Sequence, residues 1–367
     1  MPAMNEFNPL RDAIPLREVK RVLVIKLRHH GDVLLSSPVF SALKLAAPQV
    51  EIDALVYADT AEMLSLHPAI SRVFEVDRKA KQKGAMHQLK SELDLLAGLR
   101  ARSYDLILHL TEHWRGAWLS RILRPRWAVG CTRSDAGALW RRSFSHLYKV
   151  SGGLPRHTVE RNLDALRRIG VWPAPAQRRL VLVPGEAAES SVRQHLAEVG
   201  VQGRFIHIHP ASRWFFKCWP VSRMAELISR LEQAGHCVLL TAAPSQDELA
   251  MLAAIQSQLG HPVATLGGKL SLKELAALTR MADAFIGVDS APMHIAAAMG
   301  TPTVALFGPS GEKQWGPWSA QARVVSSMHH PCRPCGNDGC GGGKVSDCLE
   351  SLPVEQVMAA LDEVLDK

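Results

Sequence analysis

The chain has 367 residues, of which 47% are hydrophobic and 21% charged, and its formal net charge is +8. This composition is ordinary for a globular protein, and the length suffices for two α/β domains of roughly 150–180 residues each. The sequence has no uninterrupted apolar stretch of the ~18 residues that a membrane-spanning helix needs, and its N-terminus lacks the basic segment and apolar core of a secretory signal. The expected compartment is therefore the cytoplasm.

Residues 1–18 are expected to form a loosely ordered leader. Beyond them, short apolar runs alternate with segments of helical spacing. The first half is predicted to contain strands at 22–27, 52–56, 73–76 and 104–110, with helices near 33–46, 59–66 and 87–102. Such alternation predicts a parallel sheet with right-handed crossovers.

The turn after the first strand carries the first candidate residues. It contains Arg28, His29 and His30, followed by Gly31 and Asp32 where the next helix begins. Asp32 could simply cap that helix, or it could act as a general base that faces a cleft between two domains. The sequence lacks both the Gly-x-Gly-x-x-Gly dinucleotide fingerprint and the Walker phosphate loop, so neither of those sites is predicted.

Segment 111–150 is basic and rich in tryptophan. It holds eight Arg or Lys against two Asp or Glu, and four of the nine tryptophans of the chain. Such a pattern suits an anionic membrane surface or single-stranded nucleic acid, and a solvated basic face over buried tryptophans is a third interpretation. We favour an anionic lipid or glycolipid and expect no nucleic acid partner. The candidate contacts to acceptor or membrane are Arg28, His29, His30, Arg115, Arg121, Arg124 and Arg126.

A second α/β domain is expected after 174–189, where several Pro and Gly residues interrupt regular structure. Its predicted strands are 205–209, 237–242, 263–266, 284–288 and 303–307, with helices near 221–234, 245–259, 271–281 and 291–299. We therefore predict a leader at 1–18, domains at 19–173 and 190–352, a linker at 174–189, and a C-terminal helix in 353–367 that could pack across both domains. Two doubly wound, Rossmann-like domains would bind their ligands in a central cleft that both face.

The strand-to-helix junction at 286–294, Ile-Gly-Val-Asp-Ser-Ala-Pro-Met-His, is the strongest candidate ligand site. Asp289, Ser290 and Ala291 stand where the helix begins, and His294 lies about one turn further along. The unpaired N–H groups and positive dipole end of a helix N-terminus suit a diphosphate. An ordinary Asp/Ser cap with a surface histidine is the alternative.

Two further segments offer side chains to such a ligand. Ser212, Arg213 and Lys217 lie in the loop after strand 205–209, where Lys217 could neutralise the charge of a departing diphosphate. Asp247 and Glu248 open a helix, where they could bind sugar hydroxyls or merely interact with the helix dipole.

Four cysteines fall close together in a glycine-rich stretch, at Cys332, Cys335, Cys340 and Cys348. Four thiolates could hold a structural Zn²⁺, although their spacing is not that of a common zinc ribbon or finger. Free thiols or partial disulfides are the alternative, and no catalytic role is expected.

Four motifs occur in one order: Val-Ile-Lys-Leu-Arg-His-His-Gly-Asp-Val-Leu-Leu-Ser-Ser-Pro at 24–38, Lys-Cys-Trp-Pro at 217–220, Gly-Val-Asp-Ser-Ala-Pro-Met-His at 287–294 and Thr-Pro-Thr-Val-Ala-Leu-Phe-Gly-Pro at 301–309. From about residue 21 onward, the chain thereby resembles the ADP-heptose:lipopolysaccharide heptosyltransferases of glycosyltransferase family 9, which have a two-domain GT-B fold. The first motif is most similar to the inner-core heptosyltransferase III subgroup, which adds the third, branching heptose.

The resemblance implies an inverting transfer of L-glycero-D-manno-heptose from ADP-heptose to a lipid A–Kdo–heptose acceptor, by a peripheral enzyme at the inner face of the inner membrane. It implies an N-terminal acceptor-binding domain and a C-terminal nucleotide-sugar-binding domain. By motif, Asp32 is the general base, Lys217 contacts the donor phosphates with Ser212 and Arg213 beside it, and Asp289 holds heptose hydroxyls. The other donor-binding residues that it implies are Ser290, Ala291 and His294, together with Asp247 or Glu248.

No cofactor is expected, because a lysine and a helix N-terminus can stabilise the leaving group and the chain has no Asp-x-Asp pair. The cationic face toward phosphorylated lipopolysaccharide is expected to include Arg156, Arg161, Arg167 and Arg168. Two alternatives stay open: a GT-B transferase that uses another nucleotide-sugar donor, and a non-catalytic anion-binding protein of the same fold.

Overall fold

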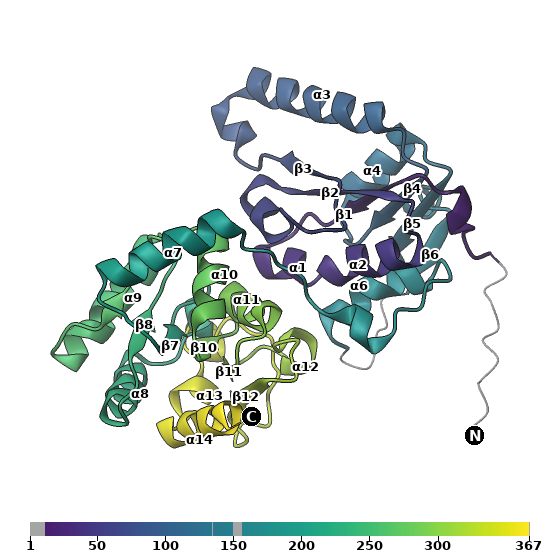
Figure 1. Ribbon diagram of the computed structural model, residues 1–367. Helices are drawn as coiled ribbons and strands as arrows, with labels where there is room; N and C mark the ends of the chain where they lie inside the picture. Colours follow the sequence, from purple (N-terminus) through teal and green to yellow (C-terminus); the bar gives the residue numbers. More distant parts are fainter. Residues whose placement is uncertain (1–11, 134, 150–155, 367) are drawn as a thin grey trace, which may run out of the picture. The chain divides into compact units, whose positions relative to one another are not determined.

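In the computed structural model, each half of the chain builds one parallel sheet of six strands (Figure 1). The structure describes residues 12–133, 135–149 and 156–366, so most of the expected leader, 1–11, lies outside the described residues. The chain divides into two compact units, Met1–Arg179 and Leu180–Lys367. In the segment expected to be a linker, Pro175–Arg178 form a short 3₁₀ helix and helix α7 begins at Glu186.

The sheet of the first unit has the strand order β3-β2-β1-β4-β5-β6, with all neighbours parallel. Its strands are β1 (Arg21–Ile25), β2 (Glu51–Tyr57), β3 (Arg72–Val76), β4 (Leu106–His109), β5 (Trp127–Cys131) and β6 (His146–Tyr148). The helices between and after them are α1 (His30–Leu34), α2 (Ser37–Ala46), α3 (Ala85–Arg102), α4 (Trp114–Leu123), α5 (Ala138–Arg141) and α6 (Thr158–Arg167).

The sheet of the second unit has the order β12-β11-β10-β7-β8-β9 and is also parallel throughout. Its strands are β7 (Ile206–His209), β8 (Val238–Leu240), β9 (Ala264–Thr265), β10 (Ala284–Val288), β11 (Thr303–Phe307) and β12 (Ala322–Ser326). Its helices are α7 (Glu186–Glu198), α8 (Val221–Gln233), α9 (Gln246–Leu259), α10 (Leu272–Met281), α11 (Ala291–Met299), α12 (Glu312–Trp315), α13 (Asp347–Glu350) and α14 (Val354–Leu365).

Each sheet reverses its winding direction next to its first strand. In the first unit, the chain runs outward from β1 to β2 and β3, and then returns to β4 on the other side of β1. In the second unit, it runs from β7 to β8 and β9 and then returns to β10. Ligands of open α/β sheets bind beyond the carboxyl ends of the strands at such a reversal. The two expected places are therefore the edges at β1/β4 and at β7/β10.

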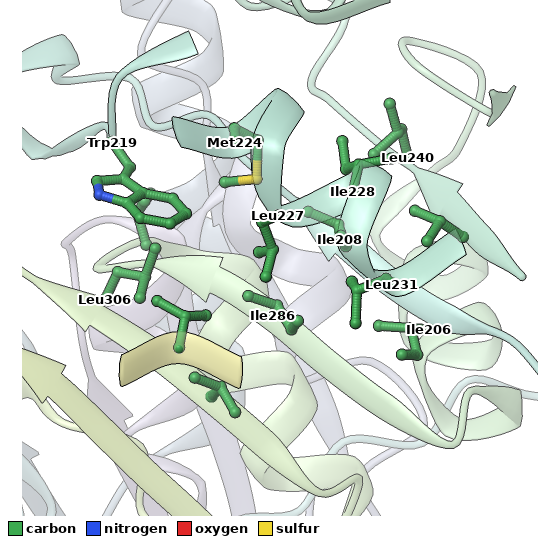
Figure 2. Packing of buried hydrophobic residues seen from close by; sticks show 14 of the residues in the cluster. Ile206, Ile208, Trp219, Met224, Leu227, Ile228, Leu231, Leu240, Ile286 and Leu306 are labelled. Carbon is green, nitrogen blue, oxygen red and sulfur yellow. The ribbon is translucent and has the colours of Figure 1, made fainter. Parts of the chain in front are cut away.

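Strands buried on both faces build the two cores, as parallel strands covered by helices require. In the first unit, Leu23 and Ile25 of β1 belong to a cluster with Leu99 of α3 and Leu119 of α4. In the second unit, α8 presents residues spaced by three and four toward the strands, which makes one apolar stripe. Figure 2 shows this core, in which Met224, Leu227, Ile228 and Leu231 of α8 pack on Ile206, Ile208, Leu240, Ile286 and Leu306 of the strands.

Helix α14 is part of the second core. Val357, Leu361 and Val364 are buried in the same cluster, and the helix contacts β11, β12 and α8. The indole N–H of Trp219 donates to the carbonyl of Leu352 just before α14, at 3.1 Å. The predicted C-terminal helix thus completes the Rossmann-like core of its own unit.

The predicted strands and helices of the second half are confirmed, but several elements were not predicted. Strands β5, β6 and β12 and helices α4, α6 and α7 are absent from the sequence-based assignment. Residues Ala58–Met63 form a 3₁₀ helix instead of the predicted α-helix. Strand β5 was not predicted because Trp127 and the preceding Arg126 were assigned to the basic segment 111–150. In the structure the Arg126 guanidinium lies 4.1 Å from the centre of the Trp127 ring.

Residues 12–18 differ from the expected loose leader. Ile14 is buried and its N–H donates to the carbonyl of Ile169 at 3.2 Å, while Asp12 forms an ion pair with Arg168. Leu16–Glu18 form a 3₁₀ helix. These long-range contacts hold the segment on the first unit. Across the described ranges, no helix is both long and apolar enough to cross a membrane.

Candidate functional site

Lys217 and Asp289 meet at the carboxyl edge of the second sheet. Lys217 ends the 3₁₀ helix Phe215–Lys217 that follows β7, and Asp289 comes directly after β10. The Lys217 Nζ lies 2.6 Å from the Asp289 Oδ2, and only 16% and 8% of the two side chains are exposed. Since β7 and β10 are neighbours at the reversal of the sheet, this ion pair occupies the place where the fold predicts a ligand.

Helix α11 begins beside this ion pair. Ser290 is its N-cap residue, with φ of −151° and no side-chain capping hydrogen bond; its hydroxyl donates instead to the Val288 carbonyl at 3.3 Å. The backbone N–H groups in the first turn of α11 therefore do not donate hydrogen bonds to the Ser290 hydroxyl. Ala291 is half-buried, and His294 is buried at 4% exposure, so the alternative of a surface histidine is wrong.

The loop that carries Lys217 is ordered by Ser212. The Ser212 side chain is buried, and its hydroxyl accepts the N–H of Trp214 at 3.4 Å. The Lys217 ammonium in turn lies 4.9 Å from the centre of the Trp214 ring, a distance at which a cation is attracted to the aromatic face. Arg213 is exposed. The structure thus places Ser212 and Lys217 at the sheet edge and Arg213 in solvent beside them.

Glu248 and Asp247 differ in burial, although they are adjacent in the sequence. Glu248 is buried and its Oε2 accepts the N–H of Ala243 at 2.9 Å and lies 3.7 Å from the His209 Nε2. Burial by itself would raise the pKa of the Glu248 carboxyl, but His209 and the Ala243 N–H together lower it below its ordinary value. Asp247 is exposed. Of the two candidates, Glu248 is therefore the one at the carboxyl ends of β7 and β8.

In the first unit, Asp32 lies in the first turn of α1, just beyond the carboxyl end of β1. It is half-buried, as are His29 and His30, whereas Arg28 is exposed. The His30 Nε2 lies 2.8 Å from the Asp59 carbonyl oxygen. A half-buried carboxylate in this place is accessible to a substrate hydroxyl, as a general base must be.

Lys26 is a residue of this edge that sequence reasoning missed. It is buried directly after β1, where its Nζ donates to the Asn162 Oδ1 at 2.9 Å and to the Leu110 carbonyl at 3.3 Å. Burial lowers the pKa of Lys26 to about 8, against the opposing effect of the Asp32 charge. The signal that could have found it is a lysine inside an otherwise apolar strand, because a buried charge is rare without a specific partner.

The basic segment divides between buried and exposed side chains. Trp140 is fully buried and its indole N–H donates to the Cys131 carbonyl at 2.9 Å, so the interpretation of a tryptophan in the core holds there. Trp114 and Trp118 are 40% and 50% exposed. Among the predicted cationic contacts, Arg115 pairs with Glu92 and Arg126 with Glu18, whereas Arg121 and Arg124 are exposed.

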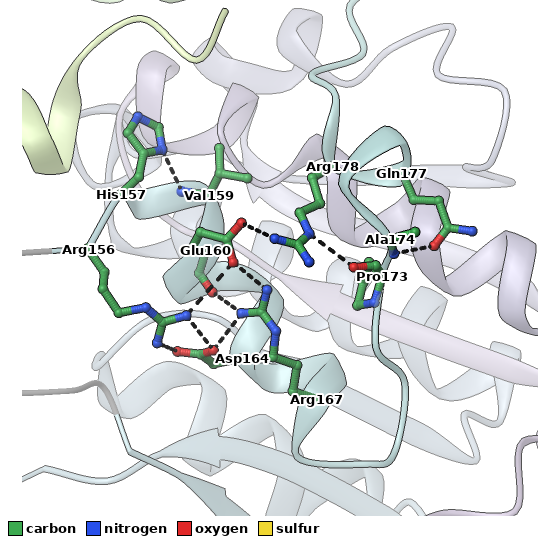
Figure 3. A network of polar contacts seen from close by, with 10 residues as sticks. All are labelled: Arg156, His157, Val159, Glu160, Asp164, Arg167, Pro173, Ala174, Gln177 and Arg178. Atoms are coloured by element: carbon green, nitrogen blue, oxygen red, sulfur yellow. Dashed lines mark hydrogen bonds and ion pairs between the residues drawn. The ribbon is translucent and has the colours of Figure 1, made fainter. Parts of the chain in front are cut away.

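Helix α6 carries an ion-pair network that changes the expected role of its arginines (Figure 3). Arg156 and Arg167 pair with Asp164 at 2.8 and 2.7 Å, and Glu160 pairs with Arg167 and with Arg178. Arg156 and Arg167 therefore both have acidic partners within the first unit. Arg168 is likewise paired with Asp12. Arg161 is half-buried, and of these four arginines it alone forms no ion pair with an acidic side chain among the described residues.

The four C-terminal cysteines do not assemble a metal site. All are free thiols, with Cys332, Cys335 and Cys340 exposed and Cys348 buried. Within the described part of the chain, no group of three or more His, Cys, Asp or Glu side chains is arranged to hold a metal ion. The zinc hypothesis is therefore not supported by the positions of these residues.

The chain matches the family model described as glycosyltransferase family 9 (heptosyltransferase) over residues 93–345. It is 39% identical to lipopolysaccharide heptosyltransferase 3 of Escherichia coli over 341 residues, which cover 92% of this chain and 97% of the relative.

Two solved structures share its fold. The glycosyltransferase family 9 protein of Veillonella parvula DSM 2008 superposes with a TM-score of 0.82 at 23% identity, covering 96% of this chain and 99% of that chain. The E. coli heptosyltransferase WaaC with ADP superposes with a TM-score of 0.74 at 20% identity, covering 94% of this chain and 99% of that chain.

Proposed function

This chain belongs to glycosyltransferase family 9, the heptosyltransferases, and from this premise we propose how it acts. It is a GT-B glycosyltransferase that moves L-glycero-D-manno-heptose from ADP-heptose to the inner core of lipopolysaccharide, where it adds the third, branching heptose. Similarity to lipopolysaccharide heptosyltransferase 3 over nearly the full length of both chains supports this activity. The observation that carries the site is the Lys217–Asp289 pair beside the start of α11.

The second unit binds the donor. The Lys217 ammonium contacts the diphosphate, and the first N–H groups of α11 with the Ser290 hydroxyl bind its oxygens. Asp289 accepts hydrogen bonds from heptose hydroxyls while it stays paired with Lys217, which fixes the sugar relative to the phosphates. Glu248 binds the ribose hydroxyls. Its buried position beside His209 supports this assignment over the exposed Asp247.

Asp32 of the first unit removes the proton from the acceptor hydroxyl. The resulting oxygen attacks the anomeric carbon of heptose, the bond from that carbon to the diphosphate oxygen breaks, and ADP leaves with inversion at the carbon. The negative charge that develops on the departing diphosphate is stabilised by Lys217 and by the positive end of the α11 dipole. These groups supply the stabilisation that a divalent metal gives in other transferases, so no cofactor is required.

The acceptor is the lipid A–Kdo–heptose core, which is anchored in the inner membrane. The enzyme therefore works in the cytoplasm at the inner face of that membrane. The net charge of +8 and the exposed Arg121 and Arg124 support attraction to an anionic membrane surface.

The test is to incubate the purified chain with ADP-heptose and a set of lipopolysaccharides truncated after zero, one, two or three heptoses, and to count added heptoses by mass spectrometry. We expect one heptose to be added to the acceptor that holds two. Transfer to a different member of the set would reject the third position, and transfer to none would reject the activity. Calorimetry with UDP-sugars is the donor control, and tight binding of a UDP-sugar would indicate another donor.

A further inference from the structure

Helices α3 and α4 leave a row of apolar side chains in water. The exposed fractions are 80% for Met86, 54% for Leu89, 56% for Leu93, 50% for Trp118 and 39% for Ile122. Within each helix these residues are three or four positions apart, so they form a continuous stripe along one side. Contiguous exposed apolar surface of this kind marks an interaction site.

A groove of about 440 Å³ runs between the two helices. Leu93 and Leu96 of α3 line one wall, Trp118 and Ile122 of α4 line the other, and the Glu92–Arg115 ion pair also contributes to the lining. The groove reaches the core, since Leu96 and Leu119 pack into the cluster under the sheet. Its floor is therefore apolar and its mouth opens to solvent.

Four cationic side chains lie on or at the end of the two helices that line this groove. Lys90 and Arg100 precede and follow Leu93 by three and seven residues, which places them on the same side of α3. Arg121 follows Trp118 by three residues on α4, and Arg124 caps the end of that helix. All four are exposed, and none forms an ion pair with any described residue. Their charge is available to an anion outside the protein.

We infer that the α3–α4 face, made of these apolar and cationic residues, is the surface by which the protein binds an anionic phospholipid bilayer. The groove takes part of an acyl chain, and Lys90, Arg100, Arg121 and Arg124 contact headgroup phosphates. The inference rests on the proposed function for the membrane-anchored acceptor and adds the surface that docks. Trp with basic residues around aliphatic side chains is typical of membrane interfaces, whereas the cores of protein–protein interfaces are depleted of lysine.

The first experiment measures sedimentation of the full chain with vesicles. We expect binding to phosphatidylethanolamine–phosphatidylglycerol vesicles that weakens at high salt, and little binding to phosphatidylcholine vesicles. The double variant Leu93→Gln/Trp118→Gln should lower the partition coefficient about tenfold. Arg121→Gln/Arg124→Gln should lower it by at least about tenfold on the anionic vesicles only.

Matched variants control for exposure and charge. Leu45→Gln changes a leucine that is 61% exposed on α2, and Arg193→Gln/Lys269→Gln removes two exposed charges from the second unit. Both should bind vesicles as the unaltered chain does. The inference would be overturned if Leu93→Gln/Trp118→Gln bound vesicles as well as the unaltered chain does. It would also be overturned if the two control variants lost as much vesicle binding as the variants of the α3–α4 face.

The second experiment tests contact with acyl chains. Vesicles with brominated acyl chains should quench part of the tryptophan fluorescence, and Trp118→Phe should reduce the quenched part, whereas Trp172→Phe, at a residue 52% exposed in the same unit, should not. Unchanged quenching in Trp118→Phe would overturn the acyl-chain contact. The inference would also be overturned if the unaltered chain formed a dimer and bound no vesicles, and if Leu93→Gln/Trp118→Gln abolished that dimer. The α3–α4 face would then be a protein–protein contact.

Failure of this inference can be told from failure of the proposed function. The vesicle assays need neither donor nor acceptor, and heptose transfer to a deacylated, lipid-free acceptor needs no membrane. We expect Leu93→Gln/Trp118→Gln to keep its transfer rate on that lipid-free acceptor, which also shows that it is folded. Transfer without vesicle binding overturns the docking surface alone, and vesicle binding without transfer overturns the enzymatic activity alone.

Discussion

The Lys217 ammonium lies 2.6 Å from the Asp289 carboxylate, although 72 residues separate them in the chain. Each follows a strand next to the reversal of the sheet, β7 or β10, so the topology brings them together. A largely buried ion pair of this kind is expensive to desolvate and is weak evidence of stability by itself. Its place beside the start of α11 is the reason we propose that it contacts the donor.

Replacing Lys217 by Met should lower kcat for heptose transfer by roughly 10²–10³-fold, because the positive charge that stabilises the departing diphosphate is lost. Binding of ADP, measured by calorimetry, should also weaken. Lys269→Met is the control, since Lys269 is an exposed lysine of the same unit. Full activity of Lys217→Met would remove Lys217 from the site.

Replacing Asp32 by Asn should lower kcat by roughly 10²–10⁴-fold and leave the Kd for ADP-heptose unchanged, because the amide keeps the shape but cannot accept the proton. Transfer to a lipid-free acceptor and donor calorimetry measure the two effects. Asp94→Asn, at an exposed residue of the same unit, should have normal kinetics. If Asp32→Asn instead weakened donor binding at constant kcat, Asp32 would not be the base.

The adjacent residues Glu248 and Asp247 should respond in opposite ways. Glu248→Gln should lower the free energy of unfolding by about 1–2 kcal/mol, because the amide lacks the negative charge that strengthens the hydrogen bond from the Ala243 N–H and attracts His209. It should also weaken ADP binding. Asp247→Asn should change neither by a measurable amount, since its side chain is exposed. Chemical denaturation and calorimetry distinguish them, and equal effects would contradict the assignment of Glu248.

Titration of Lys26 should contribute to the pH dependence of the free energy of unfolding. Burial lowers its pKa from 10.5 to about 8, so between these values the unfolded chain binds the proton that the folded chain has released. Stability therefore rises with pH across that window, by at most about 1.4 kcal/mol per pH unit from this group. Below pH 8 the group contributes no slope, because both states are protonated.

Lys26→Met should remove that contribution. The measurement is the difference in unfolding free energy between the unaltered chain and the variant at several pH values, which cancels the other titrating groups. A difference that does not vary between about pH 8 and 10.5 would show that Lys26 titrates near its ordinary pKa.

Chelation should leave the reaction rate unchanged. Lys217 and the start of α11 supply the positive charge at the leaving group, so no divalent metal is needed for ADP departure. The transfer rate measured with and without excess EDTA checks this. Loss of activity that added Mg²⁺ restores would contradict the proposed chemistry.

The motifs at 24–38 and 287–294 are sufficient by themselves to identify the two sheet edges. Strand-to-helix junctions are local features, and a short apolar run followed by Gly-Asp or Asp-Ser is visible in the sequence. The same local signal predicted β7 to β11 and the helices between them. It failed for β5 and β6, whose three to five residues mix apolar side chains with Trp, His and Cys.

The sequence by itself therefore determined the parallel α/β class, the division into two sheets and the candidate residues after β1, β7 and β10, because backbone propensity and hydrophobic period are local properties. Only the tertiary structure decided which of those residues meet. It paired Lys217 with Asp289, buried Glu248 while leaving Asp247 in water, and paired Arg156 and Arg167 with Asp164. Partner choice and burial depend on strand order and helix packing, which join residues far apart in the chain and leave no local pattern in the sequence.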